Sequence, residues 1–355
     1  MDGNFLQMAI VGYGGMGAYH VNLAHASERI RVKGAFDINA SRLRLALSHG
    51  LVAYPSFDAL LDDKDVALVL IATPNDVHKA LAIRALEAGK HVICEKPVTL
   101  TTLEFQEVLA VAEKVGRVFM VHQNRRWDDD YLIVRRLQQD KSIGEIFHLE
   151  SRVQGANGIP GDWRHSPAQG GGMVLDWGVH LLDQLLLLDR SEINRVYASL
   201  SYALGHEVDD GFTAHITFTS GLTAHIEVGT TNYIKLPRWY VKGTEGTALI
   251  ADWDLSGYVV APDRQAEVTD PLPIQAGVGL TKTMAPPNED AVVTWPLPKP
   301  LSPRVGFYDN VAEVILDGAE PMVKNAEVLR VMNLMAAIFT SWHERRAVGN
   351  IDRLI

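Results

Sequence analysis

The chain has 355 residues, of which 47% are hydrophobic and 21% charged, and its formal net charge is −10. The length predicts two domains, and the acidic balance argues against nucleic acid or an anionic membrane as partner, because both need a basic protein face. The single cysteine, Cys94, excludes an intrachain disulfide and a multi-cysteine zinc site. The start lacks a basic segment followed by an apolar one, and apolar runs stay far below the ~20 residues of a membrane span. We therefore expect a cytoplasmic protein.

The first third of the chain alternates short apolar runs with helical spacing. The runs predict strands at 8–11, 32–36, 66–71, 91–94 and 118–121. The intervening segments predict helices at 41–50, 75–88 and 101–116, the last opened by the capping-box pair Thr101 and Glu104. Repeated strand–helix units with short connections are typical of a mostly parallel, doubly wound sheet.

After about residue 123 the pattern changes to that of an α+β domain, so we divide the chain into 1–123 and 124–355. Strands are expected at 146–153, 239–241 and 247–251, and helices at 173–188, 307–317 and 326–347. Alternating apolar and polar residues on both sides of Ser220 and Gly221 predict a hairpin joined by a two-residue turn. The second sheet should therefore be largely antiparallel.

Prolines gather in one part of the second domain. Nine of the 16 lie between Pro262 and Pro303. Because proline cannot donate a ladder hydrogen bond, we expect a long surface segment with edge strands at most. A lid or an oligomer arm is one interpretation, and a plain loop is the other.

Gly12, Gly14 and Gly17 form a G-x-G-x-x-G pattern between the first predicted strand and a helix. In that setting the glycines permit a tight turn, close approach of a pyrophosphate and close helix–strand packing. Asp37 ends the second strand, where a carboxylate would bind ribose hydroxyls and repel the extra phosphate of NADP. Arg42 would soften that preference. The pattern predicts NAD, with NADP less favoured; a glycine-rich turn in another α/β protein is the alternative.

Other polar residues also follow strand ends, where ligands bind in doubly wound sheets. Thr73 and Asn75 follow the strand at 66–71 and are expected to cap the next helix, to touch the cofactor, or both. Lys96 and Pro97 follow the strand at 91–94. A lysine there would hydrogen-bond the oxygen of an oxidisable alcohol and stabilise its developing charge. A solvated surface lysine is the alternative.

The apolar helix at 173–188 carries Asp176, His180 and Asp183. Asp176 and His180 are four residues apart and so neighbours on one face. Burying them unpaired would be costly, so they either find polar partners in the core or line a wet cavity. His180 suits a proton acceptor oriented by a carboxylate. A helix-packing network stays open, as does a metal site that includes His122; we favour no metal, because no second ligand motif accompanies it.

Taken together, these motifs resemble the Gfo/Idh/MocA oxidoreductase family, which includes glucose–fructose oxidoreductase and inositol 2-dehydrogenase. The matching stretches are VGYGGMG at 11–17, ATPNDVH at 72–78, EAGKHVICEKP at 87–97, GGGMVLDWGVHLLD at 170–183, FYDN at 307–310 and EPMV at 320–323. They span nearly the whole chain in order. EKP followed by D-x-x-x-H is much more specific than the glycine pattern alone.

The resemblance implies a Rossmann domain followed by a C-terminal domain with an open, mainly antiparallel sheet, through which family members often form dimers or tetramers. The hairpin's polar face, formed by Thr213, His215, Thr217, Thr223 and His225, would make such a contact or meet solvent. The implied partners are thus a second copy of the chain and a small polyol or sugar.

The family's catalytic residues correspond to Lys96, Asp176 and His180. By resemblance, His180 removes a hydroxyl proton, hydride passes to the nicotinamide, Lys96 polarises the oxygen, and Asp176 positions the substrate and tunes His180. The cofactor-binding residues expected from the motifs are Gly12, Gly14, Gly15, Met16, Gly17, Asp37, Arg42, Thr73, Pro74, Asn75, His78, Glu95, Lys96 and Asn124.

The segment at 122–127 resembles the family's substrate side, most closely in relatives of scyllo-inositol dehydrogenases. Arg125 or Arg126 would fork onto hydroxyls or a carboxylate, and one of the two is expected to be a structural ion-pair partner. Trp163 and Arg164 form a second candidate wall, with plain packing as the alternative for Trp163. The expected substrate-binding residues are Lys96, Arg125, Arg126, Trp163, Arg164, Asp176 and His180.

The leading hypothesis is an NAD-dependent dehydrogenase acting on the CH–OH group of a sugar, inositol or related polyol. One alternative is a redox-neutral, NAD-dependent glycosidase of the same superfamily, which would oxidise transiently, eliminate and reduce again. The other is a non-enzymatic sugar sensor, against which the intact Lys96, Asp176 and His180 argue.

Overall fold

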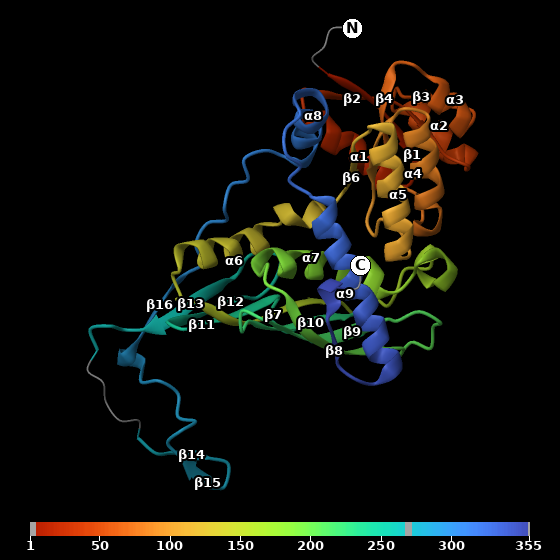
Figure 1. The fold of residues 1–355 in the computed structure, drawn as a ribbon. Helices are drawn as coiled ribbons and strands as arrows, with labels where there is room; N and C mark the ends of the chain where they lie inside the picture. The colour runs from red at the N-terminus through yellow and green to blue at the C-terminus, as the bar shows by residue number, and fades with distance from the viewer. Residues whose placement is uncertain (1–4, 267–271, 354–355) are drawn as a thin grey trace.

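The structure is a computed structural model and describes residues 5–266 and 272–353. The proline-rich prediction for 267–271 and the predictions for 1–4 and 354–355 lie outside these residues. Two sheets dominate the fold, one built from residues 6–121 and the other from residues 146–349 (Figure 1). None of the helices in the described ranges is long and apolar enough to cross a membrane.

The first sheet has six parallel strands in the order β3-β2-β1-β4-β5-β6. The strands are β1 (Leu6–Val11), β2 (Ile30–Phe36), β3 (Val52–Ala53), β4 (Val66–Ile71), β5 (His91–Cys94) and β6 (Phe119–Val121). Successive strands are added on one side of β1 up to β3 and on its other side from β4 onward. Doubly wound sheets bind ligands at this switch point, beyond the carboxyl ends of the strands. The predicted strands and the parallel sheet are confirmed.

Five helices connect these strands: α1 (Gly15–His25), α2 (Ala40–Ser48), α3 (Phe57–Asp62), α4 (His78–Glu87) and α5 (Thr102–Val115). The capping box of Thr101 and Glu104 is present, and Gly116 ends α5 in the left-handed conformation at φ 62°. The helix predicted at 75–88 instead starts as a 3₁₀ turn, η1 (Asn75–Val77). The predicted capping by Thr73 or Asn75 is wrong, because neither η1 nor α4 has a side-chain cap.

The second sheet has nine strands in the order β16-β13-β12-β11-β7-β10-β9-β8-β17. They are β7 (Ile146–Gln154), β8 (Ile193–Ser201), β9 (Gly211–Phe218), β10 (Thr223–Gly229), β11 (Trp239–Gly243), β12 (Gly246–Ile250), β13 (Gly257–Pro262), β16 (Val292–Pro296) and β17 (Val348–Gly349). β7 and β10 pair in parallel, and the other neighbours are antiparallel. The predicted mainly antiparallel sheet is confirmed.

One face of this sheet is covered by α6 (Asp129–Asp140), α7 (Val179–Leu188) and α9 (Asn325–Glu344) (Figure 1). In β9 and β10 the residues that face these helices are buried, while the alternate ones, apart from Gly211, are at least partly exposed. The alternation of apolar and polar residues in the sequence therefore corresponds to one covered and one open face of the sheet. The helix predicted to reach residue 347 ends earlier, because Arg345 takes the left-handed conformation at φ 54° and leads into β17.

The connection between β9 and β10 differs from the two-residue turn predicted at Ser220 and Gly221. The Phe218 N–H donates to the Leu222 oxygen, and the Gly221 N–H donates to the Phe218 oxygen, which leaves a three-residue loop. Gly221 has φ 96°. A three-residue hairpin loop requires that conformation at its last position, so the glycine belongs there.

The proline-rich region contributes β16, an edge strand of the large sheet, as predicted. It also forms a separate pair, β14 (Ile274–Ala276) and β15 (Gly279–Thr281), that projects from the body (Figure 1). After it the chain returns to the first sheet, where α8 (Phe307–Asp317) lies beside β2 (Figure 1). Arg29 and Asp317 form an ion pair at 2.5 Å across this contact. The C-terminal third of the chain thus also covers the first sheet.

Candidate active site

The glycine turn between β1 and α1 leaves backbone N–H groups open at the start of a helix. Gly12 has φ 90°, and a Cβ there would lie 2.6 Å from the Ala72 oxygen. A Cβ on Gly17 would lie 2.0 Å from the Gly12 oxygen. A Cβ on Gly15, in contrast, would have no atom of a neighbouring segment within 4 Å. Two glycines are thus required for packing, and the third leaves space where a pyrophosphate can meet the helix N-terminus.

Asp37 lies beside this turn at the end of β2, and two backbone groups hold its carboxylate. Its Oδ2 accepts from the Tyr13 N–H at 2.7 Å, and its Oδ1 accepts from the Asn39 N–H at 2.7 Å. Arg42 reaches the same turn: its Nη1 lies 4.0 Å from the point that a Cβ on Gly14 would occupy. An open helix N-terminus with a fixed carboxylate nearby suits the diphosphate and ribose of a nicotinamide dinucleotide.

The flanking cofactor candidates hold the loops around this turn. Thr73 Cγ2 lies 3.0 Å from the Cβ direction of Gly12, and Met16 is half-exposed in the first turn of α1. His78 is buried, with its two ring nitrogens 2.9 Å from the Thr73 oxygen and 3.1 Å from the Pro97 oxygen. Asn75 donates to the Gly170 oxygen at 3.0 Å. His78 and Asn75 therefore tie backbone segments together. Pro74 directly precedes η1, and Asn124 begins the 3₁₀ turn η2 (Asn124–Trp127).

Lys96, after β5, meets Asp176 from the π-helical turn that precedes α7. Its Nζ donates to the Asp176 main-chain oxygen at 2.8 Å and to Oδ1 at 3.1 Å. Arg164 Nε donates to Oδ2 of the same carboxylate at 3.1 Å. Burial raises the pKa of Asp176, but the charges of Lys96 and Arg164 outweigh it and hold the pKa below its ordinary value. Asp176 is therefore an anion between two cations.

His180 is almost completely buried on α7, one turn after Asp176. Its pKa lies well below the ordinary value, first because burial disfavours the charged ring and then because Lys96 and Arg125 repel it. Nδ1 of this ring is buried without a hydrogen-bond partner in the described part of the chain. A neutral imidazole with an unused nitrogen is able to accept a proton from a ligand.

The helix that carries these residues begins as a π-helical turn, η5 (Val174–Gly178), where the sequence predicted one continuous helix. Asp209 anchors its start: Oδ2 accepts from the N–H groups of Met173 and Val174, each at 2.9 Å. Burial raises the pKa of Asp209 to about 6. Wide turns of this kind recur at functional sites. Sequence reasoning missed Asp209, whose anchoring role no local pattern signals.

The two neighbouring arginines separate into different roles. Arg126 is buried and holds Asp183 with Nε at 2.8 Å and Nη2 at 2.7 Å, while Nη1 donates to Glu327 at 2.6 Å. The prediction that one of the pair is a structural ion-pair partner is confirmed for Arg126, whose ion pairs are buried. Arg125 also forms an ion pair, with Asp128 at 2.9 Å, and in addition lies over an aromatic ring: its Cζ is 4.2 Å from the centre of the Trp177 ring.

An aromatic wall stands beside His180. The rings of Trp177 and His180 meet edge to face with centres 5.9 Å apart, and Trp177 lies 6.2 Å from Trp253. Trp253, in the loop after β12, is 45% exposed. Sequence reasoning missed both indoles, although Trp177 stands between the quoted Asp176 and His180. Trp163, which it named, lies instead under Arg164, with Cζ 4.5 Å from the ring centre.

The sheet order, glycine turn and fixed Asp37 are those of dinucleotide-binding α/β proteins. Residues 6–123 match the family described as "Oxidoreductase family, NAD-binding Rossmann fold", and residues 131–249 match the "GFO/IDH/MocA C-terminal domain". The chain therefore belongs to the Gfo/Idh/MocA family and is an NAD(P)-binding oxidoreductase.

Three relatives illustrate the range of similarity. The crystal structure of an NAD-binding protein from Listeria innocua is 58% identical, with a TM-score of 0.96, over 98% of this chain and 100% of that one. An uncharacterized oxidoreductase of Schizosaccharomyces pombe is 29% identical over 86% of each chain. The scyllo-inositol 2-dehydrogenase (NADP(+)) of Bacillus subtilis is 24% identical over 97% of this chain and 95% of its own.

Proposed function

We propose that the protein is an NAD-dependent dehydrogenase that oxidises a secondary hydroxyl of a sugar, inositol or related polyol. The observation that carries the proposal is the meeting of Lys96 with Asp176, one helical turn from the neutral His180. An ammonium and a neutral imidazole are the two groups that alcohol oxidation needs at its oxygen.

In this mechanism His180 accepts the hydroxyl proton while the Lys96 ammonium donates a hydrogen bond to the same oxygen as negative charge develops there. Asp176 holds Nζ in place, and Arg164 holds the opposite side of that carboxylate. The N–H groups after Gly14 and the Asp37 carboxylate would hold the diphosphate and ribose of the cofactor. When bound, the nicotinamide supplies the acceptor for the hydride.

The aromatic wall supports a ring-shaped polyol as substrate. Trp177 and Trp253 offer flat apolar faces, while Arg125 beside them offers hydrogen-bond donors. A sugar or cyclitol presents that same combination, with C–H groups on its faces and hydroxyls at its edge. The name of the Bacillus subtilis relative points to the same class of substrate.

Two further proposals concern cofactor choice and assembly. The carboxylate of Asp37 would repel a 2′-phosphate, so we expect NAD over NADP, with Arg42 moderating the difference. We also expect a cytoplasmic homodimer or homotetramer. The open face of the large sheet carries Thr213, His215, Thr217, Thr223 and His225, each exposed or partly exposed, and can meet a second copy.

The test is NADH fluorescence after the protein is mixed with NAD and a panel of inositols, aldoses and glycosides, with NADP in parallel. A rise with a free polyol or sugar supports the dehydrogenase. Product release from a glycoside without net NADH would contradict it in favour of the redox-neutral glycosidase. Tight sugar binding without turnover of any compound would favour the sensor.

A further inference from the structure

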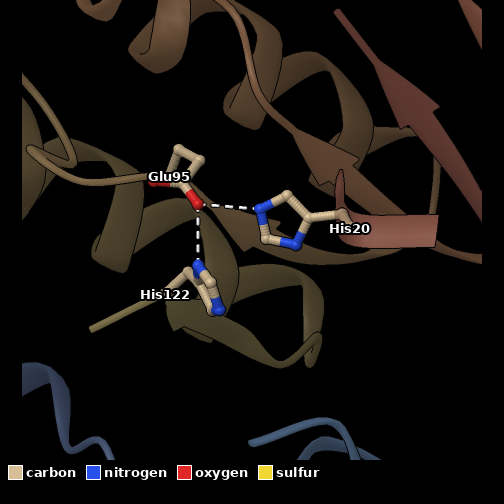
Figure 2. A group of neighbouring side chains, drawn as sticks. All are labelled: His20, Glu95 and His122. Atoms are coloured by element: carbon tan, nitrogen blue, oxygen red, sulfur yellow. Dashed lines mark hydrogen bonds and ion pairs between the residues drawn. The ribbon is translucent and has the colours of Figure 1, made fainter. Parts of the chain in front are cut away.

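Glu95, the residue before Lys96, sits in a buried cluster built from distant segments (Figure 2). Its Oε1 lies 2.7 Å from His20 Nε2 on α1 and 2.7 Å from His122 Nδ1 after β6. The Tyr308 hydroxyl on α8 lies 2.5 Å from the other nitrogen of His20. Glu95 Oε2 accepts from the Lys96 N–H at 3.1 Å. All four cluster side chains are buried.

One assignment of protons satisfies every contact. Tyr308 donates its hydroxyl proton to His20 Nδ1, which leaves Nε2–H of His20 to donate to Glu95. His122 donates Nδ1–H to the same oxygen. Burial raises the pKa of Glu95, but the two histidines outweigh it and hold the pKa well below its ordinary value. Burial also lowers the pKa of His20. The donors on His20 and His122 thus both face the Glu95 carboxylate, and the 2.7 Å separations are those of hydrogen bonds.

Because Oε1 takes two donors and Oε2 takes the N–H of Lys96, the Glu95 carboxylate has its ligands within the protein. That leaves it poorly placed to bind cofactor, the role expected from its motif. Its connections run instead to the segment that carries Lys96. The network also joins α1, which begins at the glycine turn, to α8 at the far end of the chain.

We propose that Glu95 is a positioning residue for Lys96, and that His20, His122 and Tyr308 act through Glu95. The carboxylate holds the Lys96 backbone, and the three ring residues hold the carboxylate. The arrangement thereby sets the position from which Lys96 Nζ reaches Asp176. This inference rests on the proposed function for its kinetic consequences but not for its structural ones.

The test compares donor-lacking and donor-retaining variants at one position. His122→Leu removes the Nδ1–H, whereas His122→Asn keeps an N–H near the same place. For His122→Leu we expect kcat to fall by about 10²-fold, because misplacing a reacting group by ~1 Å costs that much. The Kd for NAD should change less than about threefold, since the glycine turn and Asp37 are untouched. His122→Asn should recover most of kcat.

A second readout needs no substrate. Acylation of Lys96 by an amine-reactive ester, followed by peptide mass spectrometry, should be several-fold faster in His122→Leu than in wild type or His122→Asn, because Nζ leaves Asp176. Equal Lys96 labelling in all three proteins overturns the proposal, as does an equal loss of kcat in both variants. A wild-type protein inactive on every polyol would refute the proposed function and leave the labelling result decisive.

If His122→Leu does not fold, Tyr308→Phe takes its place. It removes one hydroxyl from a ring that stays buried, and the expected result is a several-fold rise in Lys96 labelling with unchanged NAD affinity. Unchanged labelling in folded Tyr308→Phe then counts against the network.

Discussion

Lys96 and Asp176 form an ion pair between the segment after β5 and the π-helical turn η5. Nζ of Lys96, just beyond β5 of the first sheet, lies 3.1 Å from Oδ1 of Asp176, which belongs to the π-helical turn above the second sheet. Both side chains are mostly buried, with exposed fractions of 15% and 11%. The contact therefore places the Lys96 side chain beside the helical segment that carries His180.

Replacing Lys96 with methionine should abolish turnover while leaving NAD affinity within a few-fold. The substitution keeps an unbranched side chain only one atom shorter but removes the charge that stabilises the alkoxide, an effect of roughly 10²–10³ in kcat. Stopped-flow NADH formation and a fluorescence titration with NAD measure the two quantities. Lys141→Met, at a side chain that is 65% exposed, is the matched control. Near wild-type turnover in Lys96→Met would refute the mechanism.

His180→Ala should also abolish turnover, with kcat lower by about 10²–10⁴, the usual contribution of a general base. Since burial holds the pKa of His180 well below its ordinary value, the ring is neutral throughout the neutral range. The rate of oxidation in the wild type should therefore show no loss from His180 protonation between pH 6 and 8. A wild-type kcat that rises tenfold per pH unit up to pH 7 would contradict this assignment.

Asp37→Ala should weaken NAD binding more than NADP binding. Removing an ionised acceptor from the ribose hydroxyls costs about 1.5–3 kcal/mol, or roughly 10- to 100-fold in Kd. For NADP the loss is offset, because the repulsion of the 2′-phosphate disappears with the carboxylate. Parallel fluorescence titrations give the ratio of the two affinities, and an unchanged ratio removes Asp37 from the ribose site.

Trp253→Ala should raise KM for the best polyol by about tenfold while changing kcat little, because the indole touches the substrate ring away from the reacting carbon. Since Trp253 is 45% exposed, its loss should cost little stability. Initial rates over a range of substrate concentrations separate the two parameters. An unchanged KM would show that the aromatic wall does not contact substrate.

Asp209 should make stability fall as pH rises between about 4 and 6. The pKa of its carboxyl is about 6 when folded and 3.8 in the ordinary case. Between these values the folded protein holds a proton that the unfolded chain has released, so the free energy of unfolding decreases with pH, by at most roughly 3 kcal/mol. Asp209→Asn keeps an acceptor for Met173 and Val174 but does not titrate. Urea unfolding at pH 4.5 and 6.5 should show the variant gaining relative to wild type, and parallel profiles would contradict the assignment.

Some features of this protein were determined by its sequence alone, because they depend on residues close together in the chain. The glycine turn required by Gly12, the capping box of Thr101 and Glu104, and the buried strand at 66–71 all follow from local sterics, hydrogen bonding and periodicity. So does the alternation that distinguishes the parallel sheet from the mainly antiparallel one. The predicted length of the β9–β10 loop was wrong by one residue, because turn length depends on the pairing register of the strands as well as on Gly221.

The rest was decided by the tertiary structure. Arg125 and Arg126 are adjacent and identical in type, yet Arg125 pairs with the nearby Asp128. Arg126 is instead buried against Asp183 and Glu327, which belong to helices far along the chain. Glu95 likewise takes its role from His20, His122 and Tyr308. These partners are 27 to 288 residues apart. Local periodicity carries no information about such distant contacts, which exist only once the packed sheets and helices bring the side chains together.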